Sequence, residues 1–159
     1  MKPIPVHAHN PGPMTGRGNT TWLIPGRTPV LIDAGTGDPR HLDDLEAALA
    51  GTRLACVLVT HAHVDHVTGV SRAKHALRAP VYLHRDDQFL YDAAPQQAAF
   101  FGLHCDALPA IDCYYDLSET LSFGEYDVAI HHTPGHCPGG VCLAIGKRGA
   151  PKRDLFVGD

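Results

Sequence analysis

Residues 57–69, VLVTHAHVDHVTG, restrict the fold and the chemistry of this chain more than any other stretch. A continuous apolar run ends in a threonine and is followed at once by His61, His63, Asp65 and His66. Alternate side chains of an extended segment point the same way, so His61, His63 and Asp65 are expected to converge on one point. His66 departs from this alternation, which indicates that the chain turns into a helix there. Because imidazole and carboxylate groups are zinc ligands, the stretch predicts a metal site at the end of a buried strand.

The alternative interpretation of this stretch is a polar loop whose histidines lie close together by chance. That interpretation suits any single histidine of the chain, which has 12 of them. It does not suit three histidines and one aspartate crowded into residues 61–66 directly after a strand. We therefore favour metal ligands at all four positions.

A second stretch, HHTPGHCPGG at residues 131–140, supports the first. Its Thr-Pro-Gly sequence is typical of a tight turn, which places His136 at the tip. The Gly139-Gly140 pair allows another part of the backbone to approach closely. His136 thus offers the distant ligand that a rigid metal site requires. Cys137 is either a further, soft ligand or a small side chain, and we favour the second because its neighbour already fills the role.

The rest of the sequence alternates strand-like and helix-like stretches. Leucines at helical spacing, with Asp38 as N-cap, predict a helix over residues 38–51. Two further helices are expected, at residues 66–77 and at residues 86–104, the second interrupted near Pro95. Apolar or alternating runs predict strands at residues 20–26, 29–35, 53–60, 79–84, 126–133, 140–146 and 154–158. This order of elements predicts a layered α/β domain.

Charge and cysteine content narrow the class of protein. The net charge is −4 and no block of Lys or Arg occurs, which disfavours a nucleic-acid partner and leaves a small-molecule substrate as the expected one. The five cysteines are an odd number without CxxC spacing, which indicates reduced thiols and a cytoplasmic protein. No apolar stretch is long enough to predict a signal peptide or a membrane-spanning helix.

The motifs THAHVDH, HTPGH and FVGD, at residues 60–66, 132–136 and 156–159, resemble the signature motifs of the metallo-β-lactamase superfamily and follow their order. The stretches NTTWLI and VLIDAG resemble the first paired strands of that fold, so the resemblance covers essentially the whole chain. It implies an αββα sandwich formed by a single domain at residues 1–159. It also implies a metal site, usually of two zinc ions, at the edge where the sheets meet.

The resemblance assigns a role to each matching residue. It implies one zinc ion held by three histidines, a second held by an aspartate and a histidine, and a bridging aspartate: His61, His63 and His136; Asp65 and His66; and Asp159. Iron or manganese in place of zinc remains open. Asp33 either resembles an acid that orients the HxHxDH stretch from behind or is a turn residue before Gly35, and the sequence does not decide between them.

The chain departs from the family pattern in two places. Thr68-Gly69 stands where hydrolytic members usually have Gly-Gly. Family members also usually continue beyond the Gly-Asp motif with further strands and helices and with one more histidine ligand. We therefore expect a C-terminally incomplete sandwich whose second metal position is one protein ligand short.

The implied chemistry is hydrolysis by a metal-bound hydroxide that attacks a carbonyl or phosphoryl centre. Asp65 is the expected catalytic residue, because its carboxylate can orient the nucleophile or relay a proton. The opening HNPGPMTGRGNTTWLI resembles a branch that includes glyoxalase-II-like thioesterases and endoribonuclease-like relatives. Zinc-dependent hydrolysis of a thioester or related ester is thus the first hypothesis. The alternatives are a metal-dependent endoribonuclease or phosphodiesterase, which the negative charge disfavours, and a truncated metal-binding relative with little activity.

Overall fold

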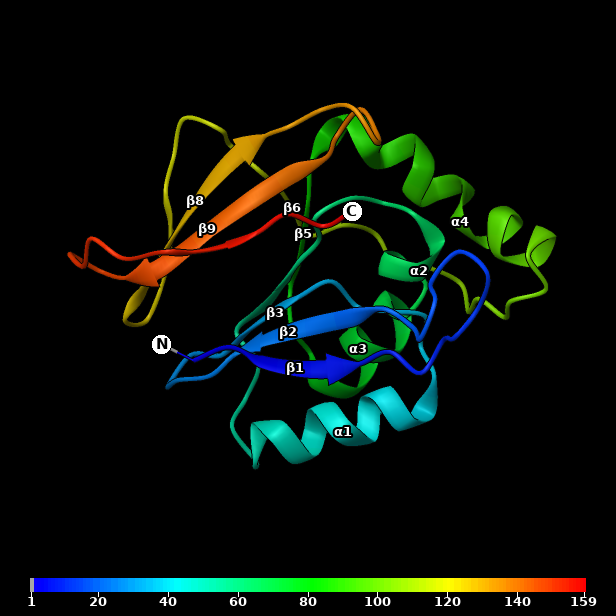
Figure 1. Cartoon of the computed structure of the whole chain (residues 1–159), viewed down its shortest axis with the longest axis horizontal. Coiled ribbons are helices and arrows are strands. Elements are labelled where there is room, and N and C mark those ends of the chain that lie inside the picture. Colours follow the sequence, from blue (N-terminus) through cyan, green and yellow to red (C-terminus); the bar gives the residue numbers. More distant parts are fainter. Residues whose placement is uncertain (1) are drawn as a thin grey trace.

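Two β-sheets packed face to face form the centre of the computed structural model, which describes residues 2–159 (Figure 1). The larger sheet has six strands in the order β1-β2-β3-β4-β5-β6, and the smaller sheet has four in the order β10-β9-β8-β7. Helices pack on the face of the larger sheet that points away from the smaller one. The layers are therefore helices, larger sheet and smaller sheet. This confirms the predicted α/β sandwich, with one helical layer among the described residues.

The larger sheet combines antiparallel and parallel pairing. Its antiparallel strands are β1 (Ile4–His7), β2 (Thr20–Ile24) and β3 (Val30–Ile32). Three parallel strands continue the sheet: β4 (Cys56–Leu58), β5 (Val81–Leu83) and β6 (Cys113–Tyr114). Parallel pairing joins β3 to β4, β4 to β5 and β5 to β6. All of β4 is buried, as its continuous apolar run predicted. Parallel strands share the direction of their carboxyl ends, so the segments that follow β3, β4 and β5 meet at one edge of the sheet.

The smaller sheet is antiparallel throughout. It consists of β7 (Leu121–Phe123), β8 (Tyr126–His132), β9 (Val141–Lys147) and β10 (Asp154–Phe156). Alternate residues of β8 point toward the larger sheet and are buried, while His131 and His132 at its end are exposed. The β8–β9 turn carries the HTPGH motif toward the same edge at which β4 ends.

Five helical segments complete the fold of the described residues. They are α1 (Pro39–Leu49), α2 (Val64–Val67), α3 (Val70–Leu77), the 3-10 turn η1 (Arg85–Asp87) and α4 (Gln88–Phe100). The start of α1 is the predicted one, because the Asp38 side chain accepts a hydrogen bond from the backbone N–H of Arg40 at 2.9 Å.

Two apolar cores hold the layers together. Between the helices and the larger sheet, Leu45 of α1 and Tyr91 of α4 are buried with Leu31 and other sheet residues. Between the two sheets, Ile32 and Leu143 are buried with their neighbours on both faces. Full burial of one such side chain contributes roughly 1.5–3 kcal/mol, so both interfaces stabilise the strand ends that carry the polar motifs.

Two helix predictions need correction. Helix α4 continues through Pro95, although an interruption was expected there. Burial of Tyr91, Ala94 and Ala98 on one face of α4 offsets the hydrogen bond that the proline ring removes. The helix expected to begin at His66 begins at Val64 instead, and it is divided into α2 and α3. Among the described residues, no helix has the length and apolar character needed to cross a membrane.

Candidate metal centre

Three histidines from two separate loops meet at the edge of the sandwich. His61 and His63 follow β4, and His136 lies on the turn between β8 and β9. One ligand atom from each of these three side chains lies within 4.8 Å of the others. The ring of His136 is 5.0 Å from that of His61 and 4.4 Å from that of His63, at interplanar angles of 75° and 87°. Because each nitrogen lone pair lies in its ring plane, steeply crossed rings can aim three lone pairs at one point.

The imidazole of His61 has one nitrogen atom without a partner. Its Nδ1 lies 3.1 Å from the hydroxyl of Thr60, and that hydroxyl donates to the Asp33 carboxylate. This network assigns the proton of His61 to Nδ1 and leaves a lone pair on Nε2. Nε2 is buried and has no hydrogen-bond partner among the described residues. Burial lowers the pKa of His61 to about 4, with the nearby His66 as the next cause, so its ring is neutral and able to bind a metal.

A second group of ligand atoms lies beside the first. It combines His61 with His66 of α2 and with Asp159, again within 4.8 Å of one another. Asp159 stands between the two groups, with one carboxylate oxygen 3.4 Å from Nε2 of His66 and the other 4.0 Å from Nε2 of His136. The hydrogen bond with His66 lowers the pKa of Asp159 to about 2, so its carboxylate is charged at neutral pH.

The position of Asp159 depends on a glycine. Gly158 has a φ of +66°, and a Cβ atom there would lie 2.9 Å from the Thr60 hydroxyl and 3.2 Å from Nδ1 of His61. The backbone after β10 therefore passes directly over the end of β4, where a larger residue has no room. This close approach brings the final carboxylate to the histidines.

The surroundings of His66 favour positive charge. Its Nδ1 lies 2.9 Å from Oδ2 of the buried Asp33. Burial by itself lowers the pKa of His66, but the charges of Asp33 and Asp65 and the hydrogen bonds to Asp33 and Asp159 outweigh it and raise the pKa to about 10. The carboxylates thus create a local field that suits a cation.

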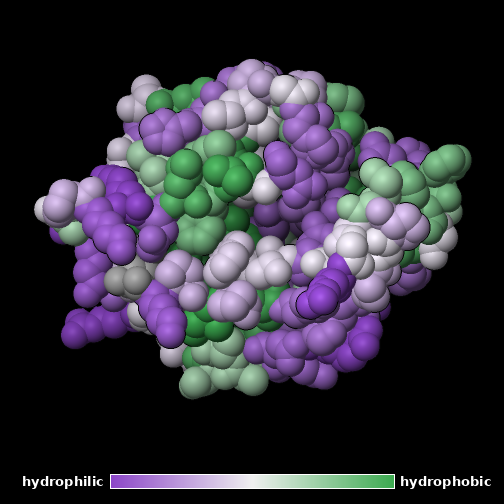
Figure 2. Space-filling model, viewed as in Figure 1, coloured by the Kyte–Doolittle hydropathy of each residue, from purple (hydrophilic) through white to green (hydrophobic). Residues whose placement is uncertain are grey.

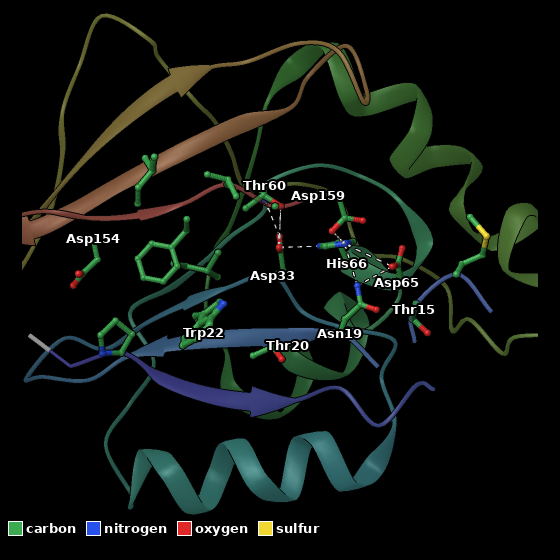
Figure 3. Close-up of a pocket in the computed structure, with 17 residues that line it drawn as sticks. Thr15, Asn19, Thr20, Trp22, Asp33, Thr60, Asp65, His66, Asp154 and Asp159 are labelled. Carbon is green, nitrogen blue, oxygen red and sulfur yellow. Dashed lines mark hydrogen bonds and ion pairs between the residues drawn. The ribbon is translucent and has the colours of Figure 1, made fainter. Parts of the chain in front are cut away.

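The contacts of Asp33 favour the orienting role over the turn role. Its Oδ1 accepts the backbone N–H of Thr60 at 2.7 Å, and its Oδ2 pairs with His66. The same carboxylate also accepts the hydroxyl of Thr60 (Figure 3). Asp33 therefore holds the histidine-rich stretch at its first residue, Thr60, and at its last histidine, His66.

Asp65 belongs to neither group of closely spaced ligand atoms. Its Oδ2 lies 3.6 Å from Nε2 of His66 and accepts a hydrogen bond from the side-chain amide of Asn19 at 2.8 Å. The expected alternation therefore holds for His61 and His63 but fails at Asp65, because helix α2 has already begun at Val64. Asp65 therefore lies beside Nε2 of His66 and the side chain of Asn19, and apart from the three converging imidazoles.

Cys137 is a small buried side chain rather than a member of the cluster. Its Sγ donates to Oδ2 of Asp87 at 3.2 Å, and neither group of closely spaced ligand atoms includes it. Burial raises the pKa of the Cys137 thiol to about 12, and the hydrogen bond to Asp87 adds to this effect. The interpretation favoured from the sequence therefore agrees with the geometry.

A third set of possible ligands, His84, Asp86 and His132, also lies within 4.8 Å. The rings of His84 and His132 are stacked, with centroids 4.2 Å apart and an interplanar angle of 11°. A single ion cannot lie in two parallel ring planes at once, so this arrangement does not suit a shared metal. Nε2 of His132 is also engaged with the carbonyl of Pro138 at 2.8 Å.

Two polar residues near the cluster were not recognised from the sequence. Asn19 contacts both Asp65 and His66, and Asp87 contacts both histidine-bearing loops. A signal existed for Asp87, because it follows β5, the parallel neighbour of β4. Asn19 directly precedes a predicted strand, which alone gives no sign of its contact with α2.

A cavity of about 570 Å³ opens beside His66 and Asp159 (Figure 3). Trp22 of β2 and Phe156 of β10 line its apolar end, with ring centroids 6.0 Å apart. Figure 2 shows this face hollowed near its centre, with hydrophobic surface on one side and hydrophilic surface on the other. The cluster therefore borders a cavity of mixed polarity.

The fold and the cluster together define a class: α/β sandwich proteins that gather histidines and aspartates at the ends of their strands. The family profile of the metallo-beta-lactamase superfamily matches residues 13–159, and the chain belongs to this superfamily, as its motifs predicted.

The chain is similar to several known members. It is 30% identical to "Hydroxyacylglutathione hydrolase GloC" of Haemophilus influenzae over 82% of this chain and 59% of GloC. It is also 30% identical to "Probable metallo-hydrolase YqgX" of Bacillus subtilis, over 80% of this chain and 60% of YqgX. Among solved structures, TTHA1623 in a di-iron-bound form is 35% identical, with a TM-score of 0.70 over 88% of this chain and 65% of that one. The chain thus spans about three-fifths of the length of these curated relatives.

Proposed function

We propose that this chain forms the metal-binding part of a metallo-hydrolase that acts on a thioester or a related ester. The buried Nε2 atom of His61, which has no hydrogen-bond partner and faces two further imidazoles, is the observation that carries this proposal. Leaving a buried polar atom unpaired costs about 1–3 kcal/mol, and a metal ion would remove that cost.

The donor set fits a pair of transition-metal ions. His61, His63 and His136 would hold one ion, and Asp65 and His66 would hold the other, with Asp159 shared between them. Imidazole and carboxylate donors suit both zinc and iron. We favour zinc and keep iron as the alternative, because the similar TTHA1623 is described in a di-iron-bound form.

When bound, such ions supply a Lewis acid that lowers the pKa of water and polarises a carbonyl group. The residues of the chain provide the rest of the chemistry. Asn19 holds Oδ2 of Asp65, and within residues 2–159 Oδ1 has no hydrogen-bond partner, so this oxygen can accept a proton from the attacking water. The Asp65 side chain is 19% exposed, which leaves it within reach of the cavity.

The choice of a thioester rests on the relatives. GloC is named a hydroxyacylglutathione hydrolase, and the match covers four-fifths of this chain. The net charge of −4 gives no support to an RNA substrate, which a basic surface would favour. A cytoplasmic location completes the proposal, because all five cysteines are free thiols.

The test combines metal analysis with turnover. Purified chain is loaded with zinc or with ferrous iron, its metal content is measured, and rates are followed on S-acyl-glutathione and acyl-CoA panels. The proposal expects two ions per chain and thioester rates well above those of free metal. Rates no higher than free metal would exclude hydrolysis by this chain. One or no ion per chain would instead support a metal-binding relative with a weakened site, and binding of labelled RNA at low salt would favour the phosphodiesterase alternative.

A further inference from the structure

Asp87 is a fully buried carboxylate at the junction of η1 and α4. It occupies the N-cap position of α4, where an aspartate usually accepts a hydrogen bond from its own helix. Its side chain makes no such bond. The carboxylate is turned away from the helix, toward the edge where β4 and β8 end.

The hydrogen bonds of this carboxylate go to the two loops that carry the clustered histidines. Oδ2 accepts the backbone N–H of Ala62 at 2.9 Å, and Ala62 lies between His61 and His63. Oδ1 accepts the backbone N–H of Gly139 at 2.6 Å, and Oδ2 also accepts the thiol of Cys137 at 3.2 Å. Asp87 therefore connects loops that are more than 70 residues apart in sequence, from Ala62 to Gly139.

The packing around Gly139 shows how closely the second loop approaches. A Cβ atom on Gly139 would lie 2.7 Å from both the carboxyl carbon and the backbone nitrogen of Asp87. Real Cβ atoms do not approach so closely, so only glycine fits at this position. The close backbone approach expected at Gly139-Gly140 is thus made to Asp87.

The chemistry of the contact requires a carboxylate. Two N–H groups and one S–H group converge on the two oxygen atoms, and an ionised carboxylate accepts on both oxygens without presenting a donor. Among residues 2–159, no Lys, Arg or His nitrogen forms an ion pair with Asp87. Hydrogen bonds alone therefore compensate for the burial of this charge. An asparagine of the same shape would point an N–H group at one of the donors.

We propose that Asp87 is a positioning residue for the metal centre, which fixes the loop of His61 and His63 relative to the loop of His136. It touches none of the three imidazoles and acts through the backbones that carry them. The inference rests on the proposed function, because the three histidines must first bind a metal. Substitution of a side chain that supports metal ligands in this indirect way typically lowers metal affinity by about 10- to 100-fold.

The decisive variant is Asp87→Asn in the full chain. Zinc affinity is measured by competition with a chromophoric chelator, and the cobalt-substituted protein is compared by its visible absorption spectrum. We expect zinc to bind about 10- to 100-fold more weakly than in the wild type, with an altered cobalt spectrum. Asp112→Asn is the matched control, because Asp112 also accepts a backbone N–H, that of Val81, but at the opposite end of β5. The control is expected to lower the melting temperature without changing zinc affinity or the cobalt spectrum.

Each outcome bears on the proposal. Wild-type zinc affinity and an unchanged cobalt spectrum in Asp87→Asn overturn it, even if the variant melts at a lower temperature. Failure of the wild-type chain to bind zinc or cobalt overturns the proposed function and this inference with it. If Asp87→Asn does not fold, Cys137→Ala decides, since it removes one of the three donors and keeps the charge. We expect it to bind zinc about 5-fold more weakly, the effect of one hydrogen bond, and an unchanged affinity again overturns the proposal.

Discussion

Asp33, at the end of β3, lies with its Oδ2 atom 2.9 Å from Nδ1 of His66, on helix α2. The side chains of both residues are less than one-tenth exposed, at 8% and 7%. Asp33 adopts a φ of +60°, a conformation that few residues other than glycine and the short polar ones tolerate. This backbone conformation turns the carboxylate toward Thr60 and His66 rather than toward solvent. The pair therefore determines which nitrogen of His66 faces the cluster.

Replacing Asp33 by asparagine should weaken metal binding. The amide keeps the shape of the side chain but places an N–H group against one of its present donors, so either His66 or Thr60 loses its acceptor. We expect zinc affinity to fall by about 10- to 100-fold, as measured by chelator competition. Asp127→Asn serves as control, because Asp127 pairs with Arg148 on the surface and should leave affinity unchanged. Equal affinities in the two variants would contradict the orienting role of Asp33.

Substitution of a clustered histidine should reduce metal binding, whereas substitution of a histidine outside the cluster should not. His136→Ala removes one of three converging imidazoles and should lower the number of ions retained per chain after dialysis. The affinity at that position should fall by more than about 100-fold, because even indirect support of a ligand has effects up to that size. His131→Ala changes an exposed histidine at the end of β8 and should retain the wild-type metal content. If His136→Ala also retains that content, the ligand role of His136 is wrong.

Much of the fold was predictable because its signals are local. The apolar runs predicted β2 to β5 and β8 to β10, although they missed the short strands β1, β6 and β7, and the Asp38 cap predicted the start of α1. The convergence of His61 with His63 follows from the two-residue period of an extended segment, which needs no tertiary information. These predictions depend on neighbours in sequence, and the structure confirms them.

The remaining details depend on contacts that are distant in sequence. Asp65 points toward Asn19, 46 residues earlier, because α2 begins before it. Asp87 binds a backbone N–H 25 residues before it and another 52 residues after it. A lone polar residue carries no periodic pattern, so the sequence did not distinguish Asp87 from an ordinary helix cap. Its contacts with both loops depend on the tertiary fold.

Gly69 should be the least replaceable glycine of the histidine-bearing region. A Cβ atom there would lie 2.0 Å from the carbonyl oxygen of Ala34 and 2.8 Å from the nitrogen of Gly37. Both neighbours are backbone atoms, so Gly69→Ala should destabilise the fold by about 3 kcal/mol or more in urea unfolding. Gly135→Ala is the matched control, because nothing lies within 4 Å of its Cβ position. The control should change stability by no more than about 0.5 kcal/mol. A similar small effect at Gly69 would show that α3 can move away from the β3–α1 loop.

The buried His41 should make stability depend on pH, independently of any metal. Burial lowers its pKa to about 4, with the charge of His9 as the next cause, and its Nε2 lies 2.8 Å from the hydroxyl of Thr21. Above pH 6.5 the ring is neutral in both the folded and unfolded states, so it has no effect on the balance between them. As the pH falls from about 6.5 to about 4, the unfolded chain binds the proton first, and the folded state loses up to roughly 3 kcal/mol.

Below about pH 4 the folded state is protonated as well, so this loss becomes constant. Urea unfolding in the presence of a chelator, at pH values between 8 and 4, measures the effect. His41→Gln retains a polar group toward Thr21 but cannot titrate, so its stability should fall less steeply with acid than that of the wild type. The exposed His75 provides the comparison, and His75→Gln should keep the wild-type slope. Identical slopes for all three proteins would show that His41 is not the group that resists protonation in the folded state.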